Sequence, residues 1–331
     1  MHRAEHISRR LKLRQLEVLL AVTKSGSMAK AAEYLAISQP VISKTIADLE
    51  NTLGVRLLDR SPQGVEPTLY GRALLQRSVA IFNDLRTSVT ELDFLSDPTA
   101  GELRVGSSEA VAVGMLGVII DRLSRQHPRL TFEVTLGGGL TDLQYRELQT
   151  HNIDLIIGRL PSVLPGDTEA EFLYHDEILI VAGMQNHWAR RRKIKLVELI
   201  NEPWCLPPLE SFPWTNAADA FRAAGLELPR RIVTARSILL LTNLVTTGRF
   251  LTALPRTVLH FRADSLQLKS LPVDVRIQSH PVGIITLKNR TLSPVAQLFI
   301  DCAREVAKPL AKGPAPSDRA KNISGHNSHT T

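Results

Sequence analysis

The sequence predicts an α/β protein in which a helical N-terminal region and one long helix precede a larger region of strands and helices. Three observations lead to this prediction. Residues 12–68 show dense helical periodicity, residues 70–95 show one amphipathic pattern, and residues 102–306 alternate β-branched runs with helical patterns. Alternation of that kind is typical of a largely parallel sheet covered by helices.

Length and composition exclude several classes of protein. The 331 residues, 44% of them hydrophobic, suit two or three domains with sizeable cores. No apolar run reaches the roughly 18 residues of a membrane span. The polar, basic segment Met1–Leu13 is followed by no apolar stretch, so we expect no secretory signal. Two cysteines, Cys205 and Cys302, do not make a disulfide scaffold, and the reducing cytoplasm is the expected compartment.

The net charge of +7 is unevenly distributed along the chain. Residues 1–95 carry 13 basic and 10 acidic side chains, residues 96–302 carry 22 and 21, and residues 303–331 carry 5 and 2. The positive excess therefore lies at the two ends. Taken alone, this charge gives only a weak indication of nucleic-acid binding.

The N-terminal pattern predicts three helices. The first begins at Leu13 and can end at Gly26. Ser27 can cap a short second helix, 28–35, and Ser38 can cap a third, 38–53, that has Pro40 in its first turn. A short helix, a tight turn and a longer helix are the arrangement of a helix-turn-helix.

The third helix has two contrasting faces on a wheel of roughly 100° per residue. Four aliphatic side chains share one face and must be buried: Ile42, Ile46, Leu49 and Leu53. Another face is small, polar and singly basic, without a carboxylate: Gln39, Pro40, Ser43, Lys44 and Ala47. This face suits a DNA major groove, because Gln can read adenine, Ser can bond phosphate or base, and Lys supplies charge. A three-helix module that only contacts proteins is the alternative.

A short β-hairpin is predicted after the third helix. Residues 55–60 alternate, residues 61–64 read as a turn, and residues 65–68 return. Such a wing would place Arg60 within reach of phosphate or the minor groove.

Long stretches of this region closely resemble LysR-type transcriptional regulators: the run Gly26 to Lys44, then Leu49-Glu50, Leu53 to Arg60 and Thr68 to Gly71. In that family the recognition helix contacts operator DNA and a wing arginine touches the backbone. The resemblance, centred on Met28 to Ala47, implies these roles for Ser38, Gln39, Pro40, Ser43, Lys44 and Arg60. Lys44 stands where Arg is more usual, which counts against bidentate reading of guanine there.

The long helix, Tyr70 to Asp93, carries a heptad stripe with one polar member: Leu75, Ser78, Phe82, Leu85, Val89 and Leu92. Packing on its own domain is one interpretation. Dimerisation is favoured, because no apolar segment nearby is predicted to cover the stripe. The resemblance agrees, since the linker helices of the family pair in dimers, and pairing implies an operator with an inverted repeat.

In the C-terminal two-thirds, small or charged polar residues stand at strand ends and helix starts, where ligands sit in α/β folds: Ser107, Ser108, Thr141 and Arg159. The region resembles the family's two-lobed effector domain, which is related to type 2 periplasmic binding proteins. Ser237, heading an apolar helix, is a candidate from the second lobe. Each of the polar residues can instead be an ordinary cap or strand end. Arg159 suits an anionic effector or, equally, an inter-lobe salt bridge.

These patterns give the following expected domains. Residues 1–69 form a winged helix-turn-helix domain, 70–95 a linker and dimerisation helix, and 96–101 a hinge. Residues 102–308 form the effector-binding domain, with lobe I about 102–161 and 266–308 and lobe II about 162–265. Residues 309–331, rich in Gly, Pro and Ser, are expected to be a disordered tail.

The leading hypothesis is therefore a cytoplasmic DNA-binding transcriptional regulator. It would bind double-stranded promoter DNA as a dimer or tetramer and respond to a small-molecule effector in the inter-lobe cleft; RNA polymerase is a further candidate partner. A ligand-binding protein of the periplasmic type with an accessory helical module is the alternative. We expect no enzyme, cofactor, metal site or membrane association, because the sequence shows no nucleophile motif, phosphate loop or metal-ligand spacing.

Overall fold

The computed structural model describes residues 10–61, 64–96, 100–137, 141–209, 211–229, 231–274, 277–288 and 290–311. The tip of the predicted wing turn, residues 97–99 of the predicted hinge and residues 312–331 of the predicted tail lie outside these ranges. The chain divides into two compact units. Unit 1 is Met1–Val89 with Gln149–Asn152, and unit 2 is Thr90–Leu148 with Ile153–Thr331.

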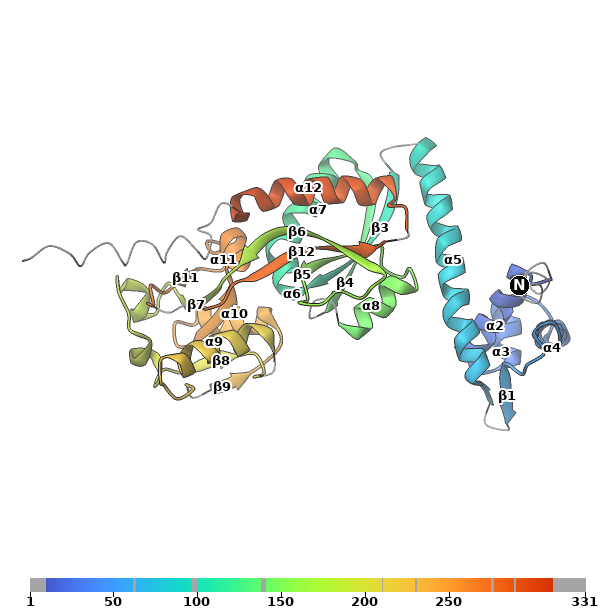
Figure 1. Cartoon of the computed structure of the whole chain (residues 1–331), viewed down its shortest axis with the longest axis horizontal. Coiled ribbons are helices and arrows are strands. Elements are labelled where there is room, and N and C mark those ends of the chain that lie inside the picture. Colours follow the sequence, from blue (N-terminus) through green and yellow to red (C-terminus); the bar gives the residue numbers. More distant parts are fainter. Residues whose placement is uncertain are drawn as a thin grey trace, which may run out of the picture. The chain divides into compact units, whose positions relative to one another are not determined.

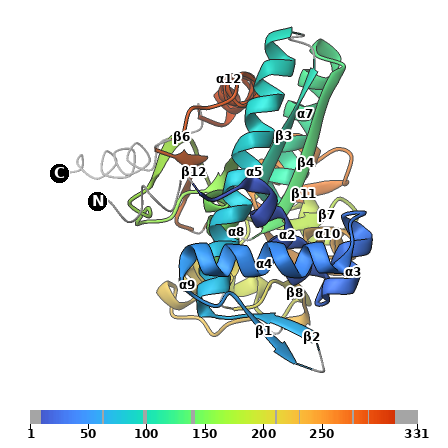
Figure 2. The same ribbon diagram turned by 90° about the vertical axis from the view of Figure 1, so that its right-hand side faces the viewer.

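Unit 1 contains the expected helices and hairpin, which can be followed in Figure 2. Its elements are α2 (Leu13–Ser25), α3 (Met28–Tyr34), α4 (Gln39–Leu53), β1 (Leu58–Ser61), β2 (Gly64–Pro67) and the part of α5 (Leu69–Ser96) that ends at Val89. Ser38 is the N-cap of α4, and Gly54, with φ of 72°, ends it. β1 and β2 pair antiparallel. A core of aliphatic side chains from α2, α3 and α4 holds the helices together, and Leu74 and Leu75 of α5 pack against it.

The predicted stripe of α5 divides into two parts. In its first half, Leu75 packs on the unit's own core and Ser78 is buried, its hydroxyl donating to the carbonyl of Leu74. In its second half, Leu85, Val89 and Leu92 are exposed. The prediction that no apolar segment covers the stripe is therefore wrong for its first half. The core of the helix-turn-helix covers that half. The second half of the stripe is thus exposed in the single chain.

Unit 2 is built on two five-stranded sheets. The first sheet has the order β4-β3-β5-β12-β6, and its strands are β3 (Ala100–Ser108), β4 (Arg129–Gly137), β5 (Leu155–Arg159), β6 (Thr168–Asp176) and β12 (His280–Leu287). The second has the order β11-β7-β10-β8-β9, and its strands are β7 (Ile178–Gly183), β8 (Trp204–Leu206), β9 (Arg231–Thr234), β10 (Leu251–Pro255) and β11 (Leu268–Ser270). β3 runs parallel to β4 and β5, whereas β12 is antiparallel to its neighbours.

Helices cover both sheets, as Figure 1 shows for unit 2. On one face of the first sheet, α7 (Gly117–Gln126) and α12 (Pro294–Ala311) enclose the larger core. On the other, α8 (Asp142–Gln149) closes a smaller one around Ile156. The remaining helices are α6 (Glu109–Val111), the π-helical turn η1 (Ala112–Leu116), the 3₁₀ turns η2 (His187–Arg190) and η3 (Leu196–Leu199), α9 (Phe212–Ala223), α10 (Ile238–Thr246) and α11 (Arg256–Arg262).

The chain passes between the lobes at other points than the sequence suggested. The predicted lobe II began at about 162, but β6 belongs to the first sheet, so the first crossing lies between Asp176 and Ile178. The predicted return at about 266 is also wrong, because β11 pairs with β7 in the second sheet and Val273 still bridges to Ile194 there. The return therefore follows Val273 and precedes β12.

The C-terminal helix is longer than expected. α12 continues through Pro309 to Ala311, so the predicted start of the tail at 309 is wrong for its first three residues. Leu310 is buried in the core of the first lobe. This burial keeps the last turn helical although Pro309 lies within it. Among the described residues, no helix is long and apolar enough to cross a membrane, and no group of three or more His, Cys, Asp or Glu side chains is placed to hold a metal ion.

Candidate DNA interface and effector site

The outer face of α4 is held in place by its inner face. Ile42, Ile46 and Leu49 are completely buried in the core of unit 1. This burial directs four of the predicted DNA-contacting residues to the surface: Ser38, Gln39, Pro40 and Lys44. The first turn of α4 contains no acidic residue, so its positive end is not neutralised by its own side chains. The N-terminal end of α4 is therefore suited to a polyanion.

Ser43 differs from the other predicted contacts. Its side chain is half-buried, and its hydroxyl donates to Met28 Sδ over 3.3 Å. The hydroxyl thus links α4 to α3 inside the domain. The helical wheel places Ser43 on the outer face, because the spacing of residues within one helix carries no information about the neighbouring Met28.

The hairpin is tied to α4 by a carboxylate. Glu50 Oε1 accepts hydrogen bonds from the backbone N–H groups of Leu57, at 2.7 Å, and Leu58, at 3.2 Å. These bonds fix the start of β1, on which Arg60 is exposed. Glu50 is a residue whose role in positioning the wing the sequence reasoning missed.

The start of α5 is tied to the same hairpin. Thr68 Oγ1 donates to the carbonyl of Arg56 and accepts from the N–H of Gly71, while the N–H of Thr68 donates to the carbonyl of Leu57. Gly71 lies so close that an added Cβ would stand 2.0 Å from the Leu57 oxygen. Only glycine fits there, which is a physical reason for the Thr68 to Gly71 sequence.

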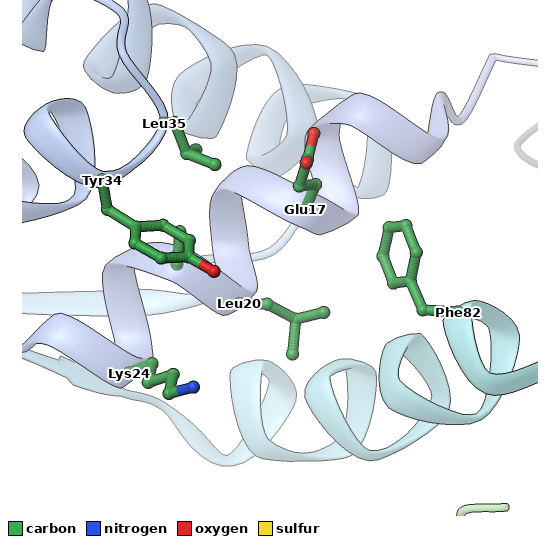
Figure 3. Close-up of a pocket in the computed structure, with 7 residues that line it drawn as sticks. Glu17, Leu20, Lys24, Tyr34, Leu35 and Phe82 are labelled. Atoms are coloured by element: carbon green, nitrogen blue, oxygen red, sulfur yellow. The ribbon is translucent and has the colours of Figure 1, made fainter. Parts of the chain in front are cut away.

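A groove of about 340 Å³ lies between α2, the end of α3 and α5. Figure 3 shows the labelled side chains around it, among which Leu20, Leu35 and Phe82 give the groove an apolar lining. Glu17 and Lys24 also line it. The exposed side chain of Leu85 follows Phe82 on the same face of α5, so the apolar surface continues along that helix.

The predicted effector residues of the first lobe lie at the carboxyl ends of its parallel strands. Ser107 is fully buried, and its hydroxyl donates to the carbonyls of Ile157 and Ser108. Ser108 is half-buried and is the N-cap of α6. Thr141 is exposed, and its hydroxyl accepts from the N–H of Gln144 at the start of α8. Ser107 therefore joins β3 to β5, while Ser108 and Thr141 stand nearer the surface.

Arg159 ends β5 within a cluster of basic groups. It is half-buried, and burial lowers the pKa of its guanidinium. Burial, together with the charges of Arg159 and His175, lowers the pKa of His280 to about 4. His280 is therefore neutral at neutral pH and can accept or donate a hydrogen bond beside a cation. His175 and His280 were missed, because their strand partners could not be assigned from the sequence.

The contact between the lobes is made partly by Glu109. Ser237 is the N-cap of α10 in the second lobe, and its hydroxyl accepts from the N–H of Leu240. Glu109 Oε1, from the first lobe, accepts from the N–H of Ile238 over 2.8 Å. The sequence reasoning missed Glu109, although an acidic residue directly after a capping serine is a recognisable signal.

A buried polar network joins β6 to the start of α11. Asp176 accepts from the N–H of Thr257, at 3.1 Å, and from its hydroxyl, at 2.7 Å. The phenol of Tyr174 lies 2.7 Å from the same hydroxyl. Burial raises the pKa of Asp176 to about 6, against the lowering effect of the bonds from Thr257 and the charge of Arg256.

A helix-turn-helix with a hairpin wing, a long helix and a unit of two α/β lobes together define a ligand-responsive DNA-binding protein. Residues 13–72 match the family described as bacterial regulatory helix-turn-helix protein, lysR family, and residues 96–308 match the LysR substrate binding domain. The chain belongs to the LysR family of transcriptional regulators. It binds DNA and a small-molecule effector, and it is not an enzyme.

Similar proteins support the same assignment. The chain is 29% identical over 297 residues to the HTH-type transcriptional regulator GbpR of Azospirillum brasilense, covering 89% of this chain and 86% of that one. It is 26% identical to the regulator TdcA of Escherichia coli K12, covering 89% and 93%. The fold matches the crystal structure of CbnR with a TM-score of 0.64 and 23% identity, covering 90% of this chain and 99% of CbnR. The structure of CbnR with its target DNA gives 0.65, also at 23% identity, covering 89% and 100%. The predicted family and fold class are confirmed.

Proposed function

We propose that the chain recognises promoter DNA in the cytoplasm through the N-terminal end of α4, with the hairpin wing on the adjacent backbone. The observation that carries this proposal is the exposure of Gln39 and Lys44 opposite the buried Ile42 and Ile46. In helix-turn-helix proteins the N-terminal residues of the recognition helix reach base edges.

Each exposed residue has a role that its chemistry suits. Gln39 can make a bidentate contact with adenine. Lys44 and Arg60 supply charge to phosphates, and Ser38 and Pro40 fit the start of α4 against the groove. Ser43 can reach the DNA only if its hydroxyl leaves Met28, so we assign it the weakest direct contact.

Gln39→Ala tests base reading. We expect binding to the operator to weaken by about 1–3 kcal/mol at one base-pair position, with little change on random duplex. The measurement is a fluorescence anisotropy titration against the wild-type operator and single-position variants of it. Equal losses on specific and random DNA would contradict the role given to Gln39.

Lys44→Ala serves as the contrasting variant. It should weaken specific and random binding alike and reduce the slope of log affinity against log salt by about 1. Lys195→Ala, which removes a positive charge from the second lobe, is the matched control and should leave both affinities unchanged.

The proposal includes self-association through α5. Leu85 and Val89 are exposed on the helix, and the apolar surface continues into the groove that Leu20 and Phe82 line. The occupant that we propose is the α5 helix of a second copy, because its own exposed leucine and valine would then be covered. Such a dimer places two α4 helices on an inverted repeat, and a pair of dimers would make the tetramer. The DNA-bound assembly is proposed to contact RNA polymerase, which transcription assays with purified polymerase can test.

The effector is proposed to bind where the two lobes meet, near Ser107, Ser108, Thr141, Arg159 and Ser237. Arg159 carries the proposal, because a half-buried guanidinium beside His280 suits a carboxylate. A thermal-shift screen with small carboxylic acids should find a stabilising compound. Arg159→Gln should abolish that shift, while Arg190→Gln, at an exposed position of the second lobe, should retain it. A shift that survives in Arg159→Gln would place the effector elsewhere.

A further inference from the structure

The segment from Glu109 to Leu116 is one of the parts of the first lobe that contact the second. Glu109 bonds to Ile238, and Ala110 and Val113 pack against an apolar cluster of the second lobe. Gly114 meets the start of α11 so closely that an added Cβ would stand 2.9 Å from the Thr257 oxygen. The segment includes a π-helical turn, a feature that is frequent at functional sites.

The first backbone N–H groups of α10 have no acceptor within the helix, and Glu109 supplies an acceptor for one of them. The sequence of α10 contains no charged residue, and its first turn has no acid. Ser237 accepts from Leu240 through its side chain and from Leu241 through its carbonyl. The N–H of Ile238 receives its acceptor from the other lobe. A carboxylate at a helix N-terminus makes a charge-assisted hydrogen bond and a favourable interaction with the helix dipole.

We propose that Glu109 is a closure latch, a carboxylate of the first lobe that caps α10 of the second and holds the two lobes against each other. Asp176 and Tyr174 bond to Thr257 at the start of α11, whereas Glu109 is bonded to α10 and lies beside the apolar contacts of Ala110 and Val113. Because a hydrogen bond is more directional than an apolar contact, the bond from Glu109 sets where α10 lies. This inference goes beyond the proposed function, because the latch depends neither on DNA nor on the identity of an effector.

The latch is tested by the distance between the lobes in the full chain without added ligand. Spin labels at Ser124→Cys, on α7 of the first lobe, and Lys193→Cys, in the second, report that distance by pulsed electron resonance. Both positions are exposed, whereas Cys205 and Cys302 are buried. The chain without introduced cysteines measures background labelling.

In this background, Glu109→Ala should shift the distance distribution to longer values and broaden it. Glu109→Gln keeps an acceptor oxygen but loses the charge, so its distribution should fall between those of wild type and the alanine variant. Glu133→Gln, at an exposed position on β4 of the first lobe, is the matched control and should reproduce the wild-type distribution. An unchanged distribution in Glu109→Ala would overturn the proposal.

Hydrogen exchange of the segment Ser237–Leu241 separates a latch from a simple helix cap. The latch predicts that exchange at Ile238 becomes at least several-fold faster in both Glu109 variants, together with the longer inter-lobe distance. Faster exchange with an unaltered distance would reduce Glu109 to a local cap and would also overturn the proposal. Neither readout depends on DNA binding, so failure here leaves the proposed regulator intact.

Discussion

Single buried charges in unit 2 differ in how completely they are compensated. Asp154 accepts from the backbone N–H and the guanidinium of Arg104, at 2.9 and 2.8 Å, and from Arg290 at 3.0 Å. Its side chain is only 11% exposed and that of Arg104 6%. Removing one partner of such a group leaves a buried charge without compensation, which costs more than the intact arrangement contributes.

Asp154→Ala is therefore expected to destabilise unit 2 by about 3–5 kcal/mol. The measurement is urea unfolding followed by tryptophan fluorescence, because all three tryptophans, Trp188, Trp204 and Trp214, lie in unit 2. Asp121→Ala breaks an exposed pair with Arg125 and should leave the unfolding midpoint unchanged. A similar shift in both variants would argue against the role of the buried network.

Asp176 makes a different prediction, because its carboxyl is buried with too little positive charge around it. Burial raises its pKa from the ordinary value of 3.8, expected in an unfolded chain, to about 6 in the folded one. Between these values the folded state binds the extra proton, so the free energy of unfolding falls as the pH rises through this window, by about 3 kcal/mol in all. Above it, the contribution is constant.

The check is the urea midpoint of unit 2 at several pH values from 4 to 7, in wild type and Asp176→Asn. The variant should lose this part of the pH dependence, because an amide does not titrate in the range. Parallel curves for the two proteins would show that another group is responsible.

The wing depends on α4 and α5 as much as on its own two strands. A two-stranded hairpin alone is only marginally stable in water. Glu50 from α4 and Thr68 before α5 supply the bonds that hold its base. The orientation of Arg60 therefore follows from these two helices.

Glu50→Ala should lower the stability of unit 1 by about 1–3 kcal/mol, because the N–H groups of Leu57 and Leu58 lose their acceptor. Hydrogen exchange of residues 55–61 should become faster, and operator binding should weaken. Asp48→Ala, at an exposed position on the same helix, is the control for stability and exchange. Normal exchange in Glu50→Ala would mean that the hairpin is held by other contacts.

Periodicity predicted the elements that have one buried face. The aliphatic residues Ile42, Ile46 and Leu49 predicted which face of α4 is buried. The structure agrees with this prediction, because each of them is fully buried. Periodicity did not predict β6, because Thr168 to Asp176 is an edge strand with charged residues among its exposed positions, and its sequence resembles that of a loop. Missing β6 displaced the predicted lobe boundary.

The candidate sites were predictable only where a residue acts alone. Gln39 and Lys44 are exposed as expected, because exposure follows from the helix itself. The bonds from Ser43 to Met28 and from Glu109 to Ile238 join residues 15 and 129 positions apart. Such pairs follow from tertiary packing, which no local pattern encodes.

For the whole molecule, the proposed dimer predicts a change in mass. The double variant Leu85→Asp with Val89→Asp places charges on the exposed part of the α5 stripe and should convert the oligomer into monomers. Sedimentation velocity measures this directly. Ser88→Asp adds charge at an exposed position between the two and should leave the mass unchanged. An oligomer that survives the double variant would require another interface.

The attachment of the hairpin to the start of α5 through Thr68 and Gly71 has a mechanical consequence. Because the backbone contact at Gly71 leaves no room for a methyl group, the hairpin cannot move freely against the start of α5. The two elements are therefore expected to move as one rigid body. Rotation of α5 about its axis therefore turns the hairpin with it, so in the proposed dimer the angle between the two hairpins would follow the orientation of the two α5 helices.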